Sequence, residues 1–296
     1  MEWLTEFPSM NADNLRALKK AIDTGFRDFT RSYGDSIEYL FEPVKIFLIQ
    51  SERFLTTTPW PIIMALIALI AWIASREIKI VIGTIITLFL IGYFDMWDDT
   101  MKTVSMTFVC TVLSIVIGIP MGIAMSRSDR LQSLVTPVLD VMQTMPSFVY
   151  LIPVVMLLGI GKVPGLLAVV IYAIPPIIRL TNLGIRLVDR DVLEAADAYG
   201  SSSWQRLRNV QMPLALPTIM AGINQTIMMA LAMVVVASMI GVQGLGQPVL
   251  KAIANQYFTL GVFNGLAIVG VAIIFDRVSQ AYGRRLQKHQ EVVHGH

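Results

Sequence analysis

Long apolar segments constrain the fold of this chain more than any other feature. A helix rises about 1.5 Å per residue, so about 20 apolar residues cross the roughly 30 Å hydrocarbon layer of a bilayer. Seven segments approach or reach this length, at about 58–75, 78–94, 102–125, 134–158, 163–182, 213–240 and 261–280. Charged residues make up only 15% of the 296 residues, whereas soluble domains carry about 25%. The sequence therefore predicts an all-α polytopic membrane protein with about seven transmembrane helices.

Positive charges indicate the orientation, because short cytoplasmic loops of membrane proteins are enriched in lysine and arginine. Here they gather in alternate loops, after the first, third, fifth and last segments: Arg76, Lys79, Arg127, Arg130, Arg179, Arg186, Arg190, Arg206, Arg208, Arg277, Arg284, Arg285 and Lys288. The intervening loops are acidic or poor in positive charge. We therefore expect a multi-pass protein whose N-terminus lies outside and whose C-terminus lies in the cytoplasm.

The same pattern divides the chain into four parts. They are an N-terminal extracytoplasmic tail at 1–55, two accessory transmembrane helices at 56–95, a core transmembrane domain at 96–282 with a cytoplasmic loop at 184–212, and a cytoplasmic tail at 283–296. Within the first part, residues 37–55 alternate apolar and charged clusters. This segment is either an amphipathic helix along the membrane interface or an ordinary surface helix that leads into the first span.

The chain contains no residue pattern typical of an enzyme. The HExxH and GxSxG motifs are absent, and Cys110 is the single cysteine. Residues 161–163, GKV, lack the upstream glycine and the following Ser or Thr of a phosphate-binding loop. The histidines, all within the last eight residues, fit a disordered tail better than a metal site: His289, His294 and His296. We expect no catalytic residue, metal or cofactor in this chain, and the net charge of +2 indicates no nucleic-acid partner.

The cytoplasmic loop at 184–212 has the pattern of helix, glycine turn and helix. Its stretch DVLEAADAYG favours a helix that ends at Gly200, because glycine adopts the left-handed conformation at little cost. Ser202 and Gln205 follow as an S-x-x-Q capping box, which begins a second helix. Two prolines are then expected to restart the chain as the next span, Pro213 and Pro217.

The two short helices offer a surface on which another protein can dock. Ala195 and Ala196 leave part of the first helix nearly flat, so that a partner can approach closely. The second helix carries Trp204, Leu207 and Val210 on one side, and tryptophan is favoured at binding hot spots. We interpret the loop as a docking site for a cytoplasmic partner; the alternative is a solvated loop.

The same loop carries a resemblance to a known family. Residues 194–213, EAADAYGSSSWQRLRNVQMP, are similar to EAA---G---------I-LP, the signature of permease subunits of bacterial ABC importers. Val210 and Met212 stand where the signature has Ile and Leu, and both are apolar and of similar size. In that family the segment is the coupling helix, which sits in a cleft of the ATP-binding subunit. The resemblance implies that coupling to the ATPase rests on Glu194, Ala195, Ala196, Gly200 and Pro213, to which we add Trp204 as a hot-spot anchor.

Longer segments resemble a narrower group. Residues 139–165, 172–186 and 221–246 are similar to the permeases of glycine betaine and proline betaine importers, and the resemblance covers roughly 60–280. It implies the type I ABC importer transmembrane fold in a bacterial cytoplasmic (inner) membrane, and a permease homodimer. It also implies two cytoplasmic ATP-binding subunits, which hold ATP and Mg²⁺, and an extracytoplasmic solute-binding protein. The implied solute is a small quaternary-amine compatible solute of the glycine betaine, proline betaine, choline or trimethylamine N-oxide type.

A path for a zwitterion should carry little net charge, because a fixed ion would hold the solute. The candidates for the translocation path or gate are residues within the spans: Asp140, Gln143, Thr144, Pro146, Asn224 and Gln225. We take Asp140 as the only carboxylate well inside an apolar span, where a charge costs about 2.5–3.5 kcal/mol. It either lines the path or forms a structural ion pair, with Arg179 as the candidate partner.

Two other functions account for parts of the sequence. An ion-coupled secondary transporter of small zwitterions needs coupling-ion ligands at mid-membrane and usually has internal repeats; the sequence offers one carboxylate and no convincing repeat. A non-transporting membrane scaffold accounts for the docking loop, but not for the polar residues and prolines within the spans. Loss of uptake on ATP depletion, with the membrane potential clamped, separates the importer from the secondary transporter.

Overall fold

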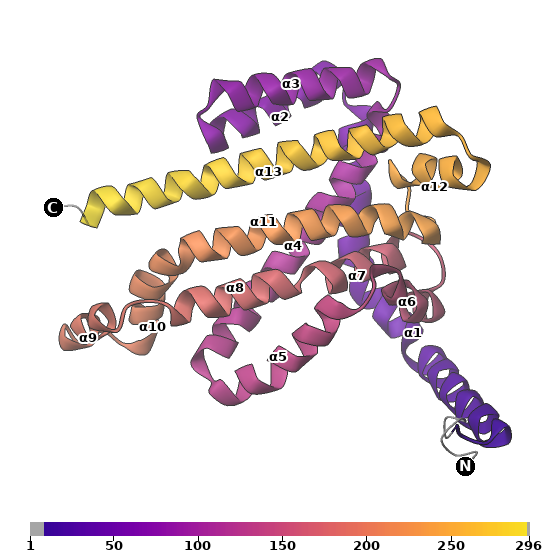
Figure 1. Ribbon diagram of the computed structural model, residues 1–296. Helices are drawn as coiled ribbons and strands as arrows, with labels where there is room; N and C mark the ends of the chain where they lie inside the picture. Colours follow the sequence, from indigo (N-terminus) through magenta and orange to yellow (C-terminus); the bar gives the residue numbers. More distant parts are fainter. Residues whose placement is uncertain (1–8, 295–296) are drawn as a thin grey trace, which may run out of the picture.

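Helices make up almost all of residues 9–294, which the computed structural model describes, and no strand occurs among them (Figure 1). In chain order they are α1 Ala12–Thr57, α2 Trp60–Ser75, α3 Ile78–Tyr93, α4 Trp97–Arg127, α5 Asp129–Thr144, η2 Ser147–Tyr150, α6 Leu151–Leu158, α7 Lys162–Ala173, α8 Pro175–Arg186, α9 Arg190–Ala198, α10 Ser203–Arg206, η3 Leu207–Gln211, α11 Met212–Ala237, η4 Ser238–Ile240, α12 Gly246–Asn255 and α13 Phe258–His294. The predicted all-α fold is confirmed.

Fewer straight spans are present than the sequence predicts. Four helical stretches in the described part of the chain are long and apolar enough to cross a membrane: Trp97–Arg127, Lys162–Arg186, Ser203–Ile240 and Phe258–Arg285. Two further spans are possible as bent pairs, in which α1 meets α2 at 114° and α5 meets the η2–α6 segment at 111°. The apolar helix α3 has only 16 residues. All seven predicted segments are helical, but bends and short lengths reduce the spans to between four and six.

The segment 134–158, which the sequence predicts as one span, is broken by a sharp bend. Pro146 favours the extended conformation that the residue before it adopts, with ψ 131°. The buried Tyr150 closes the bend by donating its hydroxyl hydrogen to the carbonyl oxygen of Met142. Its ring meets the ring of Tyr172 on α7 edge-on, with the centroids 5.8 Å apart. As a result α6 packs on α7 instead of continuing α5.

The centre of the bundle is α8, which packs against both α4 and α11. Gly118 and Gly122 lie about one turn apart on α4 and face α8. A Cβ atom on Gly118 would lie 2.3 Å from the side chain of Ile177, and one on Gly122 would lie 2.7 Å from the backbone oxygen of Ile178. This GxxxG spacing lets two helix backbones approach closely in a membrane. The α4–α8 contact therefore depends on glycine at both positions.

The two accessory helices predicted at 56–95 are α2 and α3, which form a hairpin and pack on α13 at one edge of the bundle (Figure 1). The last apolar segment, predicted at 261–280, is part of α13 and continues as helix to His294. The disordered tail predicted for the last eight residues is therefore wrong for residues 289–294, where the backbone continues the helix of the last span. His296 lies outside the described residues.

Residues 37–55 belong to the single long helix α1, whose N-terminal half extends away from the bundle (Figure 1). Its C-terminal half packs against α4, α6 and α7, and Leu48 is only 1% exposed. Glu52 accepts hydrogen bonds from the Lys162 ammonium at 2.7 and 2.8 Å. This half of α1 thus contributes to the core through Leu48 and leads into α2, while its position relative to the membrane interface stays a prediction. Its extracytoplasmic location stays a prediction.

Candidate functional site

The loop predicted to dock a partner protrudes at one end of the molecule, together with the C-terminus and opposite to α12 (Figure 1). We call residues 187–211 the elbow. None of the side chains of α9, all of which the structure describes, is buried. Tyr199 is 93% exposed and Trp204 is 63% exposed. A pair of exposed aromatic side chains at the end of a membrane protein is typical of a protein-binding surface.

The predicted glycine turn is present at the corner of the elbow. Gly200 has φ +77°, and the N–H of Ser201 donates to the Ala196 oxygen at 3.1 Å while the N–H of Gly200 donates to the Asp197 oxygen at 2.9 Å. These two bonds form the Schellman motif that ends many helices. A Cβ atom on Gly200 would meet no described atom within 4 Å. Glycine is therefore required here for its backbone conformation and not for lack of space.

The predicted capping box is also present. The N–H of Ser202 donates to the side chain of Gln205 at 2.8 Å, and the N–H of Gln205 donates to the Ser202 hydroxyl at 3.3 Å. An ion pair of 2.5 Å between Asp197 and Arg206 joins the two arms. The elbow thus has a defined local structure, while its role as a docking site stays a prediction.

The second arm of the elbow is not a separate short helix, which corrects the sequence-based expectation. α10, η3, α11 and η4 form one helical stretch of 38 residues, Ser203–Ile240. In η3 the hydrogen bonds widen to the π pattern, in which the N–H of Met212 donates to the Leu207 oxygen. This wider turn directly precedes Pro213, which has no N–H to donate, and Pro217 lies farther inside the helix. Neither proline restarts the chain: Pro213 follows the π turn, and Pro217 is accommodated within α11.

The apolar side predicted for this arm is divided between core and solvent. Leu207 is 2% exposed and packs in one cluster with Met125 of α4 and Leu139 of α5, whereas Trp204 is exposed. The difference arises because α10 continues into α11, which fixes the rotation of the helix against the bundle. The exposed residues of the elbow therefore lie on α9 and the first turn of α10 and do not include Leu207.

Two arginines, which we took from the sequence only as markers of the cytoplasmic side, attach the elbow to the corner between α4 and α5. Arg127 donates to the Ser203 oxygen at 3.3 Å. Arg186, at the end of α8, donates to the Met125 oxygen at 2.9 Å and pairs with Asp129 at 2.6 Å. Both ends of the elbow are consequently held by the bundle while its tip is free of it.

Three candidate path residues lie on the second half of α5, and the fourth, Pro146, directly precedes η2. Asp140, Gln143, Thr144 and Pro146 are all exposed. Asp140 forms the expected ion pair with Arg179 of α8. The side chains are 57% and 33% exposed respectively, so the pair is accessible from outside this chain. Its part in transport stays a prediction.

The two candidates on α11 lie in different surroundings. Gln225 is exposed, whereas the Asn224 amide donates to Asp276 of α13 at 3.1 Å and accepts from the Ser279 hydroxyl at 2.5 Å. Gln280 donates to the same Asp276 oxygen at 2.7 Å. Asn224 therefore joins two helices, and the structure groups it with α13 and not with the polar face of α5. Asp276 escaped the sequence reasoning, although a carboxylate in the apolar segment 261–280 is itself a signal.

Comparisons with known proteins agree with this architecture. The family model of the binding-protein-dependent transport system inner membrane component matches residues 114–288. Over 293 residues the chain is 42% identical to the glycine betaine/proline betaine transport system permease protein ProW of Escherichia coli (strain K12), which covers 96% of this chain and 82% of that protein. Over 229 residues it is 48% identical to the glycine betaine/carnitine transport permease protein GbuB of Listeria monocytogenes serotype 1/2a (strain 10403S), with 77% and 81% covered.

A solved structure confirms the predicted type I importer fold. A chain of the MetNI methionine ABC transporter, in inward facing conformations, matches with a TM-score of 0.57 at 21% identity. The match covers 62% of this chain and 93% of that chain. At this identity the structural similarity shows the fold alone. Membership of the family is shown by the family model and the two relatives. The chain belongs to the family of binding-protein-dependent transport system inner membrane components.

Proposed function

We propose that this chain is the permease subunit of an ATP-driven ABC importer for a small quaternary-amine compatible solute. The observation that carries the proposal is the elbow, whose tip is exposed while its second arm begins a helical stretch of 38 residues. A displacement of α9 passes through the Gly200 turn and the Asp197–Arg206 ion pair into α11. Because α11 reaches toward the opposite end of the molecule (Figure 1), it acts as a lever that moves the transport path.

The partners follow from this lever. ATP and Mg²⁺ are bound by two separate cytoplasmic subunits, each of which receives one elbow, and this chain binds no cofactor. Tyr199 and Trp204 supply aromatic anchors for that contact. A second copy of the chain covers the exposed apolar side of α5 and η2, which includes Leu134, Val141 and Phe148. The solute-binding protein docks at the other end, near α12, so that the N-terminus lies outside and the C-terminus in the cytoplasm.

The solute class is supported by charge. The names of the two relatives contain glycine betaine, proline betaine and carnitine, each of which joins a quaternary ammonium to a carboxylate and has no net charge. The Asp140–Arg179 pair on the exposed face of α5 also has no net charge, so it can face such a solute without retaining it. We place the path along this pair together with Gln143, Thr144 and Gln225. Selection among the solutes belongs to the binding protein, where an aromatic cage can hold the ammonium group.

Reconstitution tests the proposal. Proteoliposomes that contain the chain, its ATPase subunit, the binding protein and Mg-ATP are expected to accumulate labelled glycine betaine. Vesicles with the isolated chain are expected to show none, even under an imposed proton or sodium gradient. Uphill uptake by the isolated chain would contradict the proposal and support an ion-coupled transporter. Uptake by the complete assembly that persists without ATP would do the same.

A further inference from the structure

Between the accessory hairpin and the core lies a partly open apolar cavity that contains none of the candidate path or coupling residues. Its volume is about 550 Å³, and it lies between α1, α2, α3, α4, α11 and α13. Residues that line it include Phe54 of α1, Ile67 and Ala71 of α2, Phe108 of α4 and Phe275 of α13. Pockets of about 300–1,000 Å³ are large enough for a small organic ligand.

The lining excludes water and the transported solute as occupants. Only Ser51, Ser279 and Tyr282 bring a polar side chain to a wall that is otherwise aliphatic or aromatic. An apolar cavity stays dry because a water molecule needs two to four polar partners. A zwitterion would lose its hydration here without new hydrogen bonds. Hydrocarbon is the occupant that fits this lining.

Basic residues closely follow two of the lining residues in the sequence, one on α2 and one on α13. Ala74 of α2 and Tyr282 of α13 line the cavity. The Arg285 guanidinium, three residues beyond Tyr282, donates to the Ile73 carbonyl at 3.0 Å. Arg76, two residues beyond Ala74, is exposed and ends α2 in the left-handed conformation. The Arg285 guanidinium is therefore fixed against the last turn of α2, and Arg76 directly follows that turn.

The charge around these two arginines is positive. Lys79 at the start of α3 adds a third exposed cation. Arg284 is 3.9 Å from Glu77, the only carboxylate among residues 76–79 and 284–285. Four cations thus face one carboxylate, on the side where the loops of this chain are rich in arginine. Basic groups beside a membrane surface attract anionic lipid headgroups.

We propose that the cavity holds an acyl chain of an anionic phospholipid from the cytoplasmic leaflet, with its phosphate bound between Arg76 and Arg285. The apolar lining accepts the chain, and the cations select the headgroup. The lipid fills the space between α2 and α13 and so attaches the accessory hairpin to the core. The site depends on the membrane location of the chain and not on the identity of the solute.

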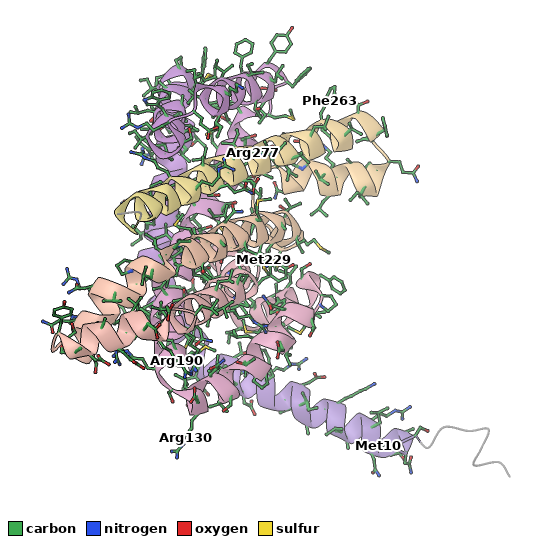
Figure 2. All side chains as sticks on the ribbon, turned by 60° about the vertical axis from the view of Figure 1, so that its left-hand side comes forward. Met10, Arg130, Arg190, Met229, Phe263 and Arg277 are labelled. Atoms are coloured by element: carbon green, nitrogen blue, oxygen red, sulfur yellow. The ribbon has the colours of Figure 1, made fainter. Side chains whose placement is uncertain are left out.

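Lipid retention measures the site. The full chain is extracted with mild detergent from nanodiscs of equal parts phosphatidylglycerol and phosphatidylcholine, and lipids that stay bound are counted by native mass spectrometry. The wild-type chain is expected to retain phosphatidylglycerol over phosphatidylcholine. In the Arg76→Gln/Arg285→Gln variant, the ratio of retained phosphatidylglycerol to retained phosphatidylcholine is expected to fall about tenfold. The reason is that each cation near an anionic surface contributes to lipid binding. Arg130→Gln, an exposed arginine at the opposite edge of the molecule (Figure 2), is the matched control and should change nothing.

A second variant tests the acyl-chain part of the site. Ala74→Phe narrows the cavity and is expected to lower retention of phosphatidylglycerol without altering the surface charge. If Ala74→Phe does not fold, the lipid retention of the Arg76→Gln/Arg285→Gln variant still tests the proposal, because both arginines are exposed. Equal retention of both lipids by the wild-type chain, or unchanged preference in the double arginine variant, overturns the proposal. If Ala74→Phe changes the oligomeric state but not the lipid retention, the cavity is occupied by another protein chain. That result also overturns the proposal.

Discussion

Asn224 on α11 and Asp276 on α13 face each other within the bundle, where the asparagine amide donates to the aspartate carboxylate at 3.1 Å. Ser279 donates to Asn224, and Gln280 donates to Asp276. A carboxylate within a membrane protein costs several kcal/mol unless it is hydrogen-bonded or reaches water. The network satisfies Asp276 with neutral donors and joins two helices that are distant in sequence.

Asn224→Ala should therefore destabilise the chain by about 1 kcal/mol, the magnitude typical of hydrogen bonds between membrane helices. Gln225→Ala is the matched control, because its side chain is exposed on the same helix. It should leave the free energy of unfolding unchanged. Unfolding by SDS in mixed micelles measures both variants. Equal effects would contradict the assignment of Asn224 to the α11–α13 contact.

The ion pair between Glu52 and Lys162 should hold α1 against the start of α7. A double-mutant cycle with Glu52→Gln and Lys162→Met is expected to give a coupling free energy of about 1 kcal/mol, because both groups are partly shielded from water. Thermal unfolding in detergent provides the four stabilities. Coupling indistinguishable from zero would mean that α1 is held by apolar packing around Leu48 alone.

Gly122→Val should prevent the close packing of α4 on α8, since its Cβ would lie 2.7 Å from the Ile178 backbone oxygen, which cannot move without displacing the helix. Overpacking of this kind costs at least about 1–3 kcal/mol. The control is Gly265→Val in α13, where a Cβ meets no described atom within 4 Å. The yield of folded protein in size-exclusion chromatography and the SDS midpoint report the difference. Comparable stability of the two variants would show that α4 and α8 separate easily.

Gly200→Val should uncouple ATP hydrolysis from uptake while the chain still inserts. A β-branched residue at φ +77° costs roughly 1–2 kcal/mol or more, so the Schellman turn opens and the arms lose their angle. We expect solute uptake by this variant to be about tenfold lower than that of the wild-type assembly. The stimulation of ATPase activity by loaded binding protein should fall by a similar factor. Gly200→Asn, which tolerates this conformation, is the control and should retain most activity. Normal uptake by Gly200→Val would remove the turn from the coupling route.

We expect the Asp140–Arg179 pair to support transport because its two charges cancel. Asp140→Asn and Arg179→Gln each leave one unpaired charge on the exposed face of α5 and α8, and this charge attracts one end of the zwitterion. Uptake of labelled glycine betaine should therefore fall in each single variant more than in the double variant, where no charge remains. A double variant that is as impaired as the worse single variant would contradict this reason.

Features that depend on neighbouring residues could be predicted. The helical character of the apolar segments, the left-handed Gly200 and the reciprocal bonds of Ser202 and Gln205 are set by residues that are neighbours in the sequence, and the structure contains each of them. Arg179 was also a sound candidate as partner for Asp140. The family signature placed the elbow, although not the exposure of Tyr199 at its tip.

Features that depend on which helices meet could not be predicted. Asn224 and Gln225 are adjacent amides in the sequence, and only the position of α13 makes one a structural link and leaves the other exposed. Whether Pro213 restarts a helix or is accommodated in one depends on the π turn before it. The sequence by itself determined a helical membrane protein with a capped elbow, because hydropathy and capping are local properties. The tertiary structure alone decided the bend before α6, the continuity of the elbow with α11 and the apolar cavity, because each depends on the side chains of helices that are distant along the chain.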